Sequence, residues 1–183
     1  GKANQFYLRG FNLDHGTDLR TTVDGMLVNQ RSHAHGQGWT DLNFLIPELA
    51  TGLEYKKGPY FANEGDFSSA GAVSIRYADT LAKGIASVGF GENGYKRLLL
   101  ADSPAVGNGH LLFALERQTN DGPFNEPDKY NKLNGVLRYS EGDAANGFNL
   151  TGMGYSAHWN STDQIPKRAV NAGLIDRFDA IDT

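Results

Sequence analysis

Five runs of alternating apolar and polar residues, separated by clusters of turn residues, occupy the middle of the chain. Because successive side chains of a β-strand point to opposite faces, such alternation predicts strands with one apolar and one polar face. Strands at this regular spacing form an antiparallel meander in a sandwich or a barrel. The runs lie near residues 81–90, 95–102, 110–119, 132–140 and 148–159.

The two faces of these predicted strands differ sharply in chemistry. In the run at 110–119, Phe113 and Leu115 share one face and Glu116 lies on the other. In the run at 132–140, Leu137 alternates with Arg138 in the same way. A membrane barrel with a wet lumen produces this pattern. A soluble sheet with one solvated face produces it too, so the pattern alone leaves both architectures open.

Composition excludes several classes of protein. The net charge is −4 and no basic cluster is present, which argues against nucleic-acid binding. The chain has no cysteine, so disulfides, thiolate metal sites and cysteine nucleophiles are excluded. No run of 18 apolar residues predicts a membrane-spanning helix. Glycine accounts for 23 of the 183 residues, which suits a β-rich chain with many turns.

Two motifs resemble patterns of cofactor-binding or catalytic proteins, but the residues around each motif do not fit such a role. Residues 89–94 match the glycine pattern G-x-G-x-x-G, but the next segment, 95–102, is too short for the helix of a dinucleotide fold. A hairpin turn is the better interpretation. Ser156 lacks the final glycine of the hydrolase motif G-x-S-x-G. We therefore predict neither an enzyme nor a cofactor.

Residues 1–77 predict a small mixed unit dominated by loops. Asp24-Gly25 lies between apolar residues, which is the strongest short-range signal for a β-hairpin. Residues 40–46 predict a capped helical turn that stops at Pro47. Apolar or alternating stretches at 6–11, 53–56 and 72–77 predict strands.

Histidines are concentrated in this first unit. His33 and His35 are two residues apart, so both imidazoles share one face if the segment is a strand. They are candidate metal ligands, together with His15 and with Asp14, Asp18 and Asp41. The alternative is that each ring hydrogen-bonds to neighbouring loop backbone and binds no metal.

The order of short motifs in the first unit resembles the plug domain of TonB-dependent outer-membrane receptors. In that family an R-G-F strand precedes a V-D-G hairpin, a short helix, a strand ending in K-G-P, and a strand that leads into the barrel. The residues of this plug motif are Arg9, Gly10, Asp24, Gly25, Lys57, Gly58 and Pro59. The matching segments are Leu8-Arg9-Gly10-Phe11, Val23-Asp24-Gly25-Met26, Ile46-Pro47-Glu48-Leu49, Tyr55-Lys56-Lys57-Gly58-Pro59 and Ala70-Gly71-Ala72-Val73.

The resemblance implies a mainly β chain in which a mixed α+β piece of plug precedes an antiparallel β-meander of an outer-membrane β-barrel. Residues 1–77 would be the C-terminal part of the plug, 78–159 the first five or so barrel strands, and 160–183 an extracellular loop. Barrels of the plugged class have about 22 strands. We therefore expect a fragment that holds the second half of the plug, with the TonB-contacting box outside it.

The resemblance also implies a function. Such receptors actively import a scarce ligand, most often a ferric siderophore or another metal chelate, across the outer membrane of a Gram-negative bacterium. The expected partners are outer-membrane lipid, a TonB-type energy-transducing protein and a small chelate ligand; no nucleic acid is expected. The alternative is a soluble β-rich module that binds a metal or another ligand.

Family plugs bind ligand through loop tips that face outward. The corresponding tips here are residues 12–20, 30–39 and 60–68, with the loops at 120–131 and 160–183 as partners. Packing between plug and barrel is the alternative role for the aromatic side chains among them. The predicted ligand-binding residues are His15, His33, His35, Gln37, Trp39, Tyr60 and Phe61.

Overall fold

The computed structural model describes residues 6–8, 10–13, 16–33, 37–143, 145–162 and 164–181. The chain divides into two compact units, residues 1–78 and 79–183, which are treated separately below. Both units are built from β-strands, and helix is confined to two short segments of the described chain. The predicted mainly β class is therefore confirmed.

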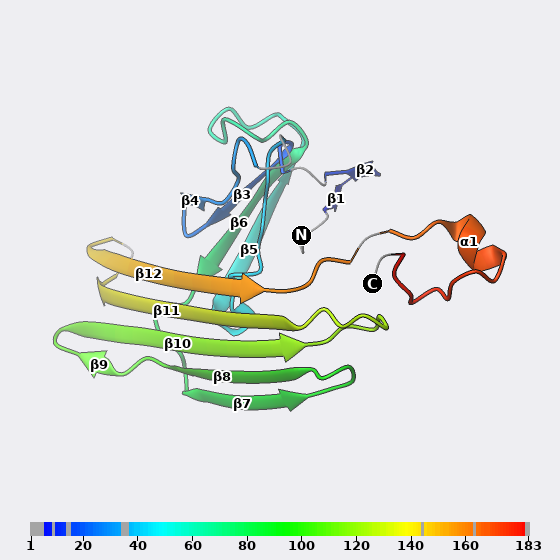
Figure 1. Ribbon diagram of the computed structural model, residues 1–183. Coiled ribbons are helices and arrows are strands. Elements are labelled where there is room, and N and C mark those ends of the chain that lie inside the picture. The colour runs from blue at the N-terminus through cyan, green and yellow to red at the C-terminus, as the bar shows by residue number, and fades with distance from the viewer. Residues whose placement is uncertain are drawn as a thin grey trace. The chain divides into compact units, whose positions relative to one another are not determined.

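The first unit contains a four-stranded mixed sheet in the order β4-β3-β6-β5 (Figure 1). Strand β3 runs parallel to β6, and the other neighbours are antiparallel. A short hairpin, β1–β2, precedes this sheet in the chain. The elements are β1 (Tyr7–Leu8), β2 (Phe11–Asn12), β3 (Leu19–Val23), β4 (Met26–Leu27), the 3-10 helix η1 (Pro47–Leu49), β5 (Ala50–Lys57) and β6 (Gly71–Tyr77).

A small apolar core holds this sheet together. The core residues with no exposed surface are Val23, Ile46 and Leu49. Two residues of β6, Ile75 and Tyr77, are also buried. The Tyr77 hydroxyl accepts a hydrogen bond of 2.9 Å from the Ile46 backbone N–H. Because a buried phenol needs a polar partner, this bond fixes the segment before η1 against β6.

The predicted hairpin at Asp24-Gly25 is confirmed. Asp24 and Gly25 have φ angles of 48° and 79°, the left-handed pair that a tight turn between β3 and β4 requires. The Asp24 carboxylate also accepts a hydrogen bond of 3.0 Å from the Tyr77 N–H. Asp24 therefore both shapes the turn and ties it to the end of β6.

The predicted capped turn at 40–46 is present as a single hydrogen-bonded turn, but it is not helical and Pro47 does not stop a helix. The Asp41 carboxylate caps the Asn43 N–H at 2.7 Å, and residues 42–45 close a single turn through a Leu45–Leu42 backbone bond of 3.0 Å. The helix follows instead, with Pro47 in its first turn. Proline lacks the N–H that this position would leave unpaired, so it starts the helix and does not stop one.

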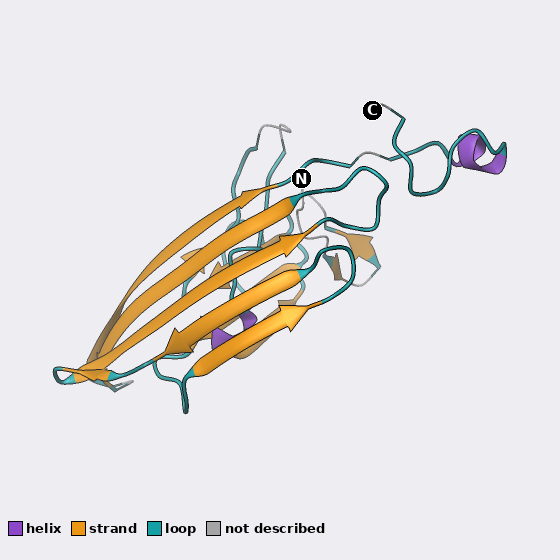
Figure 2. Cartoon of the chain, turned by 60° about the horizontal axis from the view of Figure 1, so that its bottom comes forward, coloured by secondary structure: helices purple, strands orange, loops and turns teal. Residues whose placement is uncertain are grey.

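The second unit is an antiparallel sheet in the order β12-β11-β10-β8-β7, with the short β9 paired to β10 (Figures 1 and 2). All five predicted strands are confirmed within a few residues. Among the described residues the sheet does not close, because β7 and β12 each pair on one side only. The strands are β7 (Ile85–Phe90), β8 (Lys96–Asp102), β9 (Ala105–Val106), β10 (Gly109–Asn120), β11 (Tyr130–Gly142) and β12 (Gly147–His158).

A smaller prediction in this unit is also confirmed. The glycine pattern at 89–94 forms a hairpin turn, with Asn93 and Gly94 at φ angles of 52° and 69°. The tail carries the short helix α1 (Lys167–Asn171), which ends before Gly173 at a φ of 70°.

The left-handed turn at Gly25 gives a direct test of the first unit. A Cβ added at Gly25 would have no neighbouring atom within 4 Å, so the expected cost of a β-branched residue is backbone strain. We expect Gly25→Val to lower the free energy of unfolding of this unit by about 1 kcal/mol or more. Urea unfolding can be followed by Trp39 fluorescence in a Trp159→Phe background, which leaves the first unit with the only tryptophan.

Gly25→Asn is the matched control for this test, because asparagine tolerates the left-handed region. It should unfold close to the parent midpoint. Wild-type stability of Gly25→Val would contradict the turn.

Candidate functional site

The long sheet of the second unit exposes large hydrophobic side chains and buries charged ones, the reverse of the usual arrangement in water. Directly opposed residues of antiparallel strands share a face, so the register assigns every side chain to one of two sides. The first face, here called the apolar face, is exposed although its central residues are large hydrophobics. On the five longer strands its large exposed hydrophobic residues are Val88, Phe90, Leu98, Leu100, Phe113, Leu115, Leu133, Leu137, Phe148 and Leu150.

The opposite face, here called the polar face, is buried at its centre, on β8, β10 and β11, although it carries charge. Small or apolar side chains such as Ala101, Leu112 and Val136 alternate on it with buried ions. The buried polar and charged residues of this face are Glu116, Lys132, Asn134 and Arg138.

A charge cluster lies at the centre of the polar face. Only 1% of Glu116 on β10 is exposed. Its carboxylate accepts hydrogen bonds from Arg97 Nε on β8 at 2.7 Å and from Lys132 Nζ on β11 at 2.9 Å. The Asn134 amide donates a longer bond of 3.4 Å to the same carboxylate. Buried ions are tolerated only with such partners, so these three strands must stay in register.

Arg138 forms a second polar anchor on this face. Its side chain is 5% exposed, and its Nη2 lies 2.6 Å from the Asp79 carboxylate at the start of the second unit. Its Nη1 also reaches Thr151 of β12 at 3.3 Å. Arg138 therefore ties the first residue of this unit to β11 and β12.

In the first unit, hydrogen bonds join the three predicted ligand-facing loops. The buried Asn29 amide nitrogen lies 2.7 Å from the Gly16 carbonyl and 2.9 Å from Thr40 Oγ1, and so links residues 12–20 to the end of the loop at 30–39. Arg31 pairs with Asp66 at 2.9 Å, which links that loop to residues 60–68. The sequence did not predict that Asn29 would be buried, because a lone asparagine in a loop carries no such signal.

The loop at 58–70 is tied down at both sides. Glu64 pairs with Lys56 of β5 and lies 3.7 Å from Arg20 of β3. The Asp18 carboxylate accepts a hydrogen bond from Ser69, and the Asp18 carbonyl accepts one from the Ala70 N–H at 2.8 Å. These contacts hold the loop to β5, to β3 and to the segment before β3.

His33 and Trp39 are the predicted binding residues that the structure brings into contact. Their rings stack at a centroid distance of 4.1 Å and an angle of 7°. Two backbone hydrogen bonds of 2.8 and 3.1 Å between Gln30 and Trp39 close the loop at its base. Gln37 is exposed near the tip. His15 and His35 lie outside the described residues.

The aromatic pair Tyr60 and Phe61 lies in the loop after β5. Tyr60 is 77% exposed and Phe61 39% exposed, and the ammonium of Lys56 lies 5.2 Å from the Phe61 ring centroid. Within the described residues, no group of three or more His, Asp or Glu side chains could hold a metal ion. Tyr60 and Phe61 present an exposed aromatic surface on this loop.

The remaining motif residues form turns. Gly58 follows β5 with a φ of 84°, and a Cβ there would come within 2.4 Å of the Tyr60 ring. Lys57 lies 5.4 Å from the Tyr55 ring centroid, and Pro59 is exposed. Gly10 makes the turn of the β1–β2 hairpin with a φ of 81°. Arg9 lies outside the described residues.

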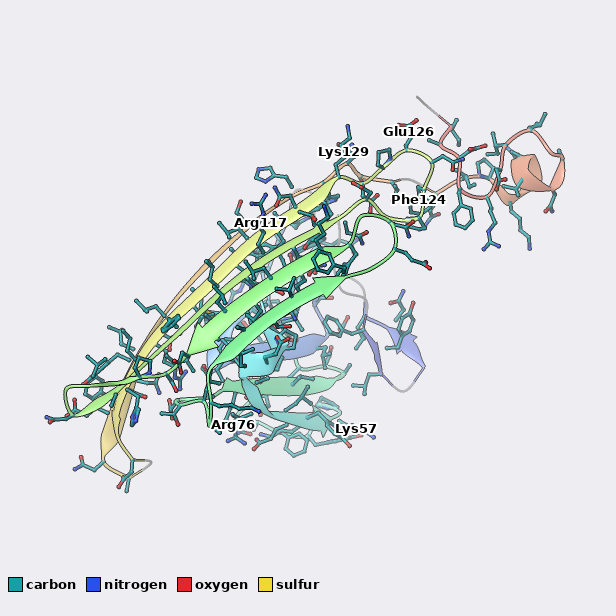
Figure 3. The ribbon with its side chains drawn as sticks, turned by 90° about the horizontal axis from the view of Figure 1, so that it is seen from below. Lys57, Arg76, Arg117, Phe124, Glu126 and Lys129 are labelled. Atoms are coloured by element: carbon teal, nitrogen blue, oxygen red, sulfur yellow. The ribbon has the colours of Figure 1, made fainter. Side chains whose placement is uncertain are left out.

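A groove of about 840 Å³ lies between the β10–β11 loop and the C-terminal tail of the second unit. Phe124 packs edge to face against Phe178 at a centroid distance of 6.3 Å, and the Asn125 N–H donates to the Phe178 carbonyl at 3.0 Å. At the other end, the Asn160 N–H donates to the Asp128 carbonyl at 2.7 Å. Figure 3 shows Phe124 and Glu126 on this loop. The sequence predicted that these two loops would join the plug loops in binding a ligand, but it did not predict the groove between them.

Asp179 anchors the tail to the β10–β11 loop. Hydrogen bonds from the Asp176 N–H and from the Asn125 side-chain amide hold the pKa of the Asp179 carboxyl below its usual range. A carboxyl whose pKa is lowered by folding stabilises the folded form above its unfolded pKa, near 3.9, and loses that effect as the pH falls through the lowered value. The anchor is therefore present at neutral pH.

We expect Asp179→Ala to release the tail. Amide hydrogen exchange at Asn125, measured by mass spectrometry at neutral pH, should become faster, because the loop loses a side-chain bond beside its backbone bond to Phe178. Asp176→Ala keeps the backbone N–H that binds Asp179 and is the matched control. Equal exchange in the parent and in Asp179→Ala would contradict the anchor.

No protein-family model and no curated protein matches the chain. In the part of the chain that the structure describes, no helix has the length and hydropathy that crossing a membrane requires.

Proposed function

We propose that this chain is part of a TonB-dependent outer-membrane receptor that imports a metal chelate, most often a ferric siderophore in this family. The observation that carries the proposal is the reversed sheet of the second unit. Ten large hydrophobics are exposed on the apolar face of its five longer strands, and the centre of the face that carries Glu116 is buried. In water this arrangement is unfavourable, whereas strands of a membrane barrel place apolar side chains in lipid and polar ones inside.

Strand length and edge chemistry support the same assignment. Strands β10, β11 and β12 have 12, 13 and 12 residues, and a tilted strand needs about 9–11 to cross a membrane. Both outer strands of the sheet, β7 and β12, are unpaired on one side among the described residues. In a barrel each edge would pair with a further strand, which removes the exposed backbone groups.

The first unit suits the role of a plug. Its small core and its buried, fully hydrogen-bonded Asn29 hold a sheet whose loops are tied together at one end. The exposed Tyr60 and the stacked His33 and Trp39 lie on these loops, where we propose that the chelate binds. The motif residues Asp24, Gly25 and Gly58 adopt the left-handed turns that this sheet needs.

The alternative is a soluble metal- or ligand-binding module, and the apolar face distinguishes the two. A soluble module would need a partner to cover this face, whereas a membrane covers it without one.

The membrane assignment is tested by a charge on the apolar face. Leu115 lies near the middle of β10 and is 50% exposed. Arginine at the middle of a lipid-facing strand costs about 2–4 kcal/mol, and near the membrane surface about 0–1 kcal/mol. We expect Leu115→Arg to reduce the amount of protein assembled in the outer membrane, measured by heat-modifiable gel mobility. Asn131→Arg, on the same face near the strand end, should assemble normally.

The contrary result is equally clear. Normal assembly of Leu115→Arg, or purification of the parent as a monodisperse protein without detergent, would contradict the membrane assignment.

The import role is tested in cells that lack the gene. We expect these cells to take up less radioactive metal from at least one of ferric citrate, a ferric hydroxamate, a ferric catecholate and cobalamin. A wild-type copy should restore uptake, and a protonophore should abolish it while cell-surface binding persists. Uptake equal to that of the parent for all four chelates would contradict a metal-chelate importer.

A further inference from the structure

Charge is segregated along the apolar face of the second unit. Among the strand residues of this face, the cations Lys96 and Arg117 lie at the end near the turns at 91–94 and 121–129. The acids Asp102 and Glu141 lie at the other end, and the residues between carry no charge. The exposed hydrophobic band thus has one basic and one acidic border.

Lys96 and Arg117 are close neighbours on adjacent strands. Lys96 opposes Thr119, and Arg117 opposes Leu98 in the pairing of β8 with β10. The two cations are therefore diagonal neighbours on one face, a relation that places such residues about 7–8 Å apart. Their long side chains can reach a common group from this distance.

A shallow groove of about 340 Å³ runs beside these two cations. It is lined by Val88 and Phe90 of β7, by Lys96 and Leu98 of β8 and by Arg117 of β10. Phe90 is 77% exposed and Val88 62% exposed, so the groove is open to its surroundings. An occupant would therefore meet an apolar floor and a doubly positive end.

Neither cation has an ion-pair partner within the described residues. The contrast with Arg97 is informative, because Arg97 sits between the same strands on the polar face and pairs with Glu116 at 2.7 Å. Glu116 precedes Arg117 in the sequence but lies on the polar face, and Glu92 and Asp121 are exposed in the turns beyond the strands. The apolar face thus keeps two positive charges available at one border. Figure 3 shows Arg117 on β10, with Lys129 at the loop end of β11.

We propose that Lys96 and Arg117 bind the phosphate of an anionic membrane lipid whose acyl chain lies along Val88, Phe90 and Leu98. A guanidinium holds a phosphate through two hydrogen bonds and an ammonium adds a point charge, so the pair suits a phosphate with two negative charges. The apolar floor selects a lipid over free phosphate. This inference rests on the proposed function, because it requires the apolar face to contact lipid.

The proposal also sets the orientation of the sheet. The basic border, with the turns at 91–94 and 121–129, lies at the membrane surface that is richer in phosphate groups. The acidic border at Asp102 and Glu141 lies at the other surface.

The test is lipid selectivity in a membrane. The protein that contains this chain is reconstituted in phosphatidylcholine vesicles with trace spin-labelled phosphatidic acid or spin-labelled phosphatidylcholine, and electron paramagnetic resonance measures the motionally restricted fraction of each lipid. We expect phosphatidic acid to associate about tenfold more strongly than phosphatidylcholine. The double variant Lys96→Gln with Arg117→Gln should lose this preference.

Lys83→Gln with Lys167→Gln removes the same charge from exposed positions outside the strands and is the matched control; it should keep the preference. No preference in the parent, or a preference that survives in the Lys96/Arg117 variant, would overturn the proposal. Full displacement of phosphatidic acid by millimolar inorganic phosphate would identify a free-phosphate site and overturn it too. Absence of any restricted lipid would instead contradict the proposed membrane function, which keeps the two failures distinguishable.

Discussion

The burial of the Glu116 carboxylate between Arg97 and Lys132 is the interaction on which the second unit depends. Three strands supply these three ions, so the cluster forms only in the observed register. A slip of one residue would move Glu116 to the apolar face and Leu115 to the polar face. The burial of charge at the centre of one face and the lack of charge between the two borders of the other are therefore one constraint, and the exposed hydrophobic band follows from it. The proposed membrane role and lipid site both derive from this separation.

The first unit is stabilised differently, because it has few buried apolar residues and several loops to hold in place. Its core of Val23, Ile46 and Leu49 is small, and hydrogen bonds complete it. Asp24 joins the β3–β4 turn to β6, Tyr77 fixes the segment before η1, and Asn29 links two loops. Polar anchors of this kind can be separated without exposing a large dry core. This property suits a plug that must be remodelled to release a bound ligand.

Strand alternation predicted β7, β8, β10, β11 and β12 because the period of two persists over each run. It did not reveal which face would be buried, since polar-in and polar-out sheets share the same pattern. The turn at Asp24-Gly25 was predictable because only left-handed backbone fits there. Pro47 misled the helix prediction, because proline both stops and starts helices.

The groove beside Phe124 and the burial of Asn29 were missed for one reason. Their hydrogen bonds join residues distant in sequence, such as Asn125 with Asp179, and no local pattern encodes such contacts.

The most direct test of the central claim is the environment of alternate residues on β11. Single nitroxide labels are placed at Leu133, Leu137, Asn134 and Val136 in the protein reconstituted in lipid vesicles, and collisions with oxygen and with a water-soluble nickel complex are measured. We predict high oxygen and low nickel accessibility at Leu133 and Leu137. At Asn134 and Val136, which are buried, we predict lower oxygen accessibility than at Leu133 and Leu137. High nickel accessibility at Leu133 and Leu137, or oxygen accessibility there no higher than at Asn134 and Val136, would contradict a lipid-facing apolar surface.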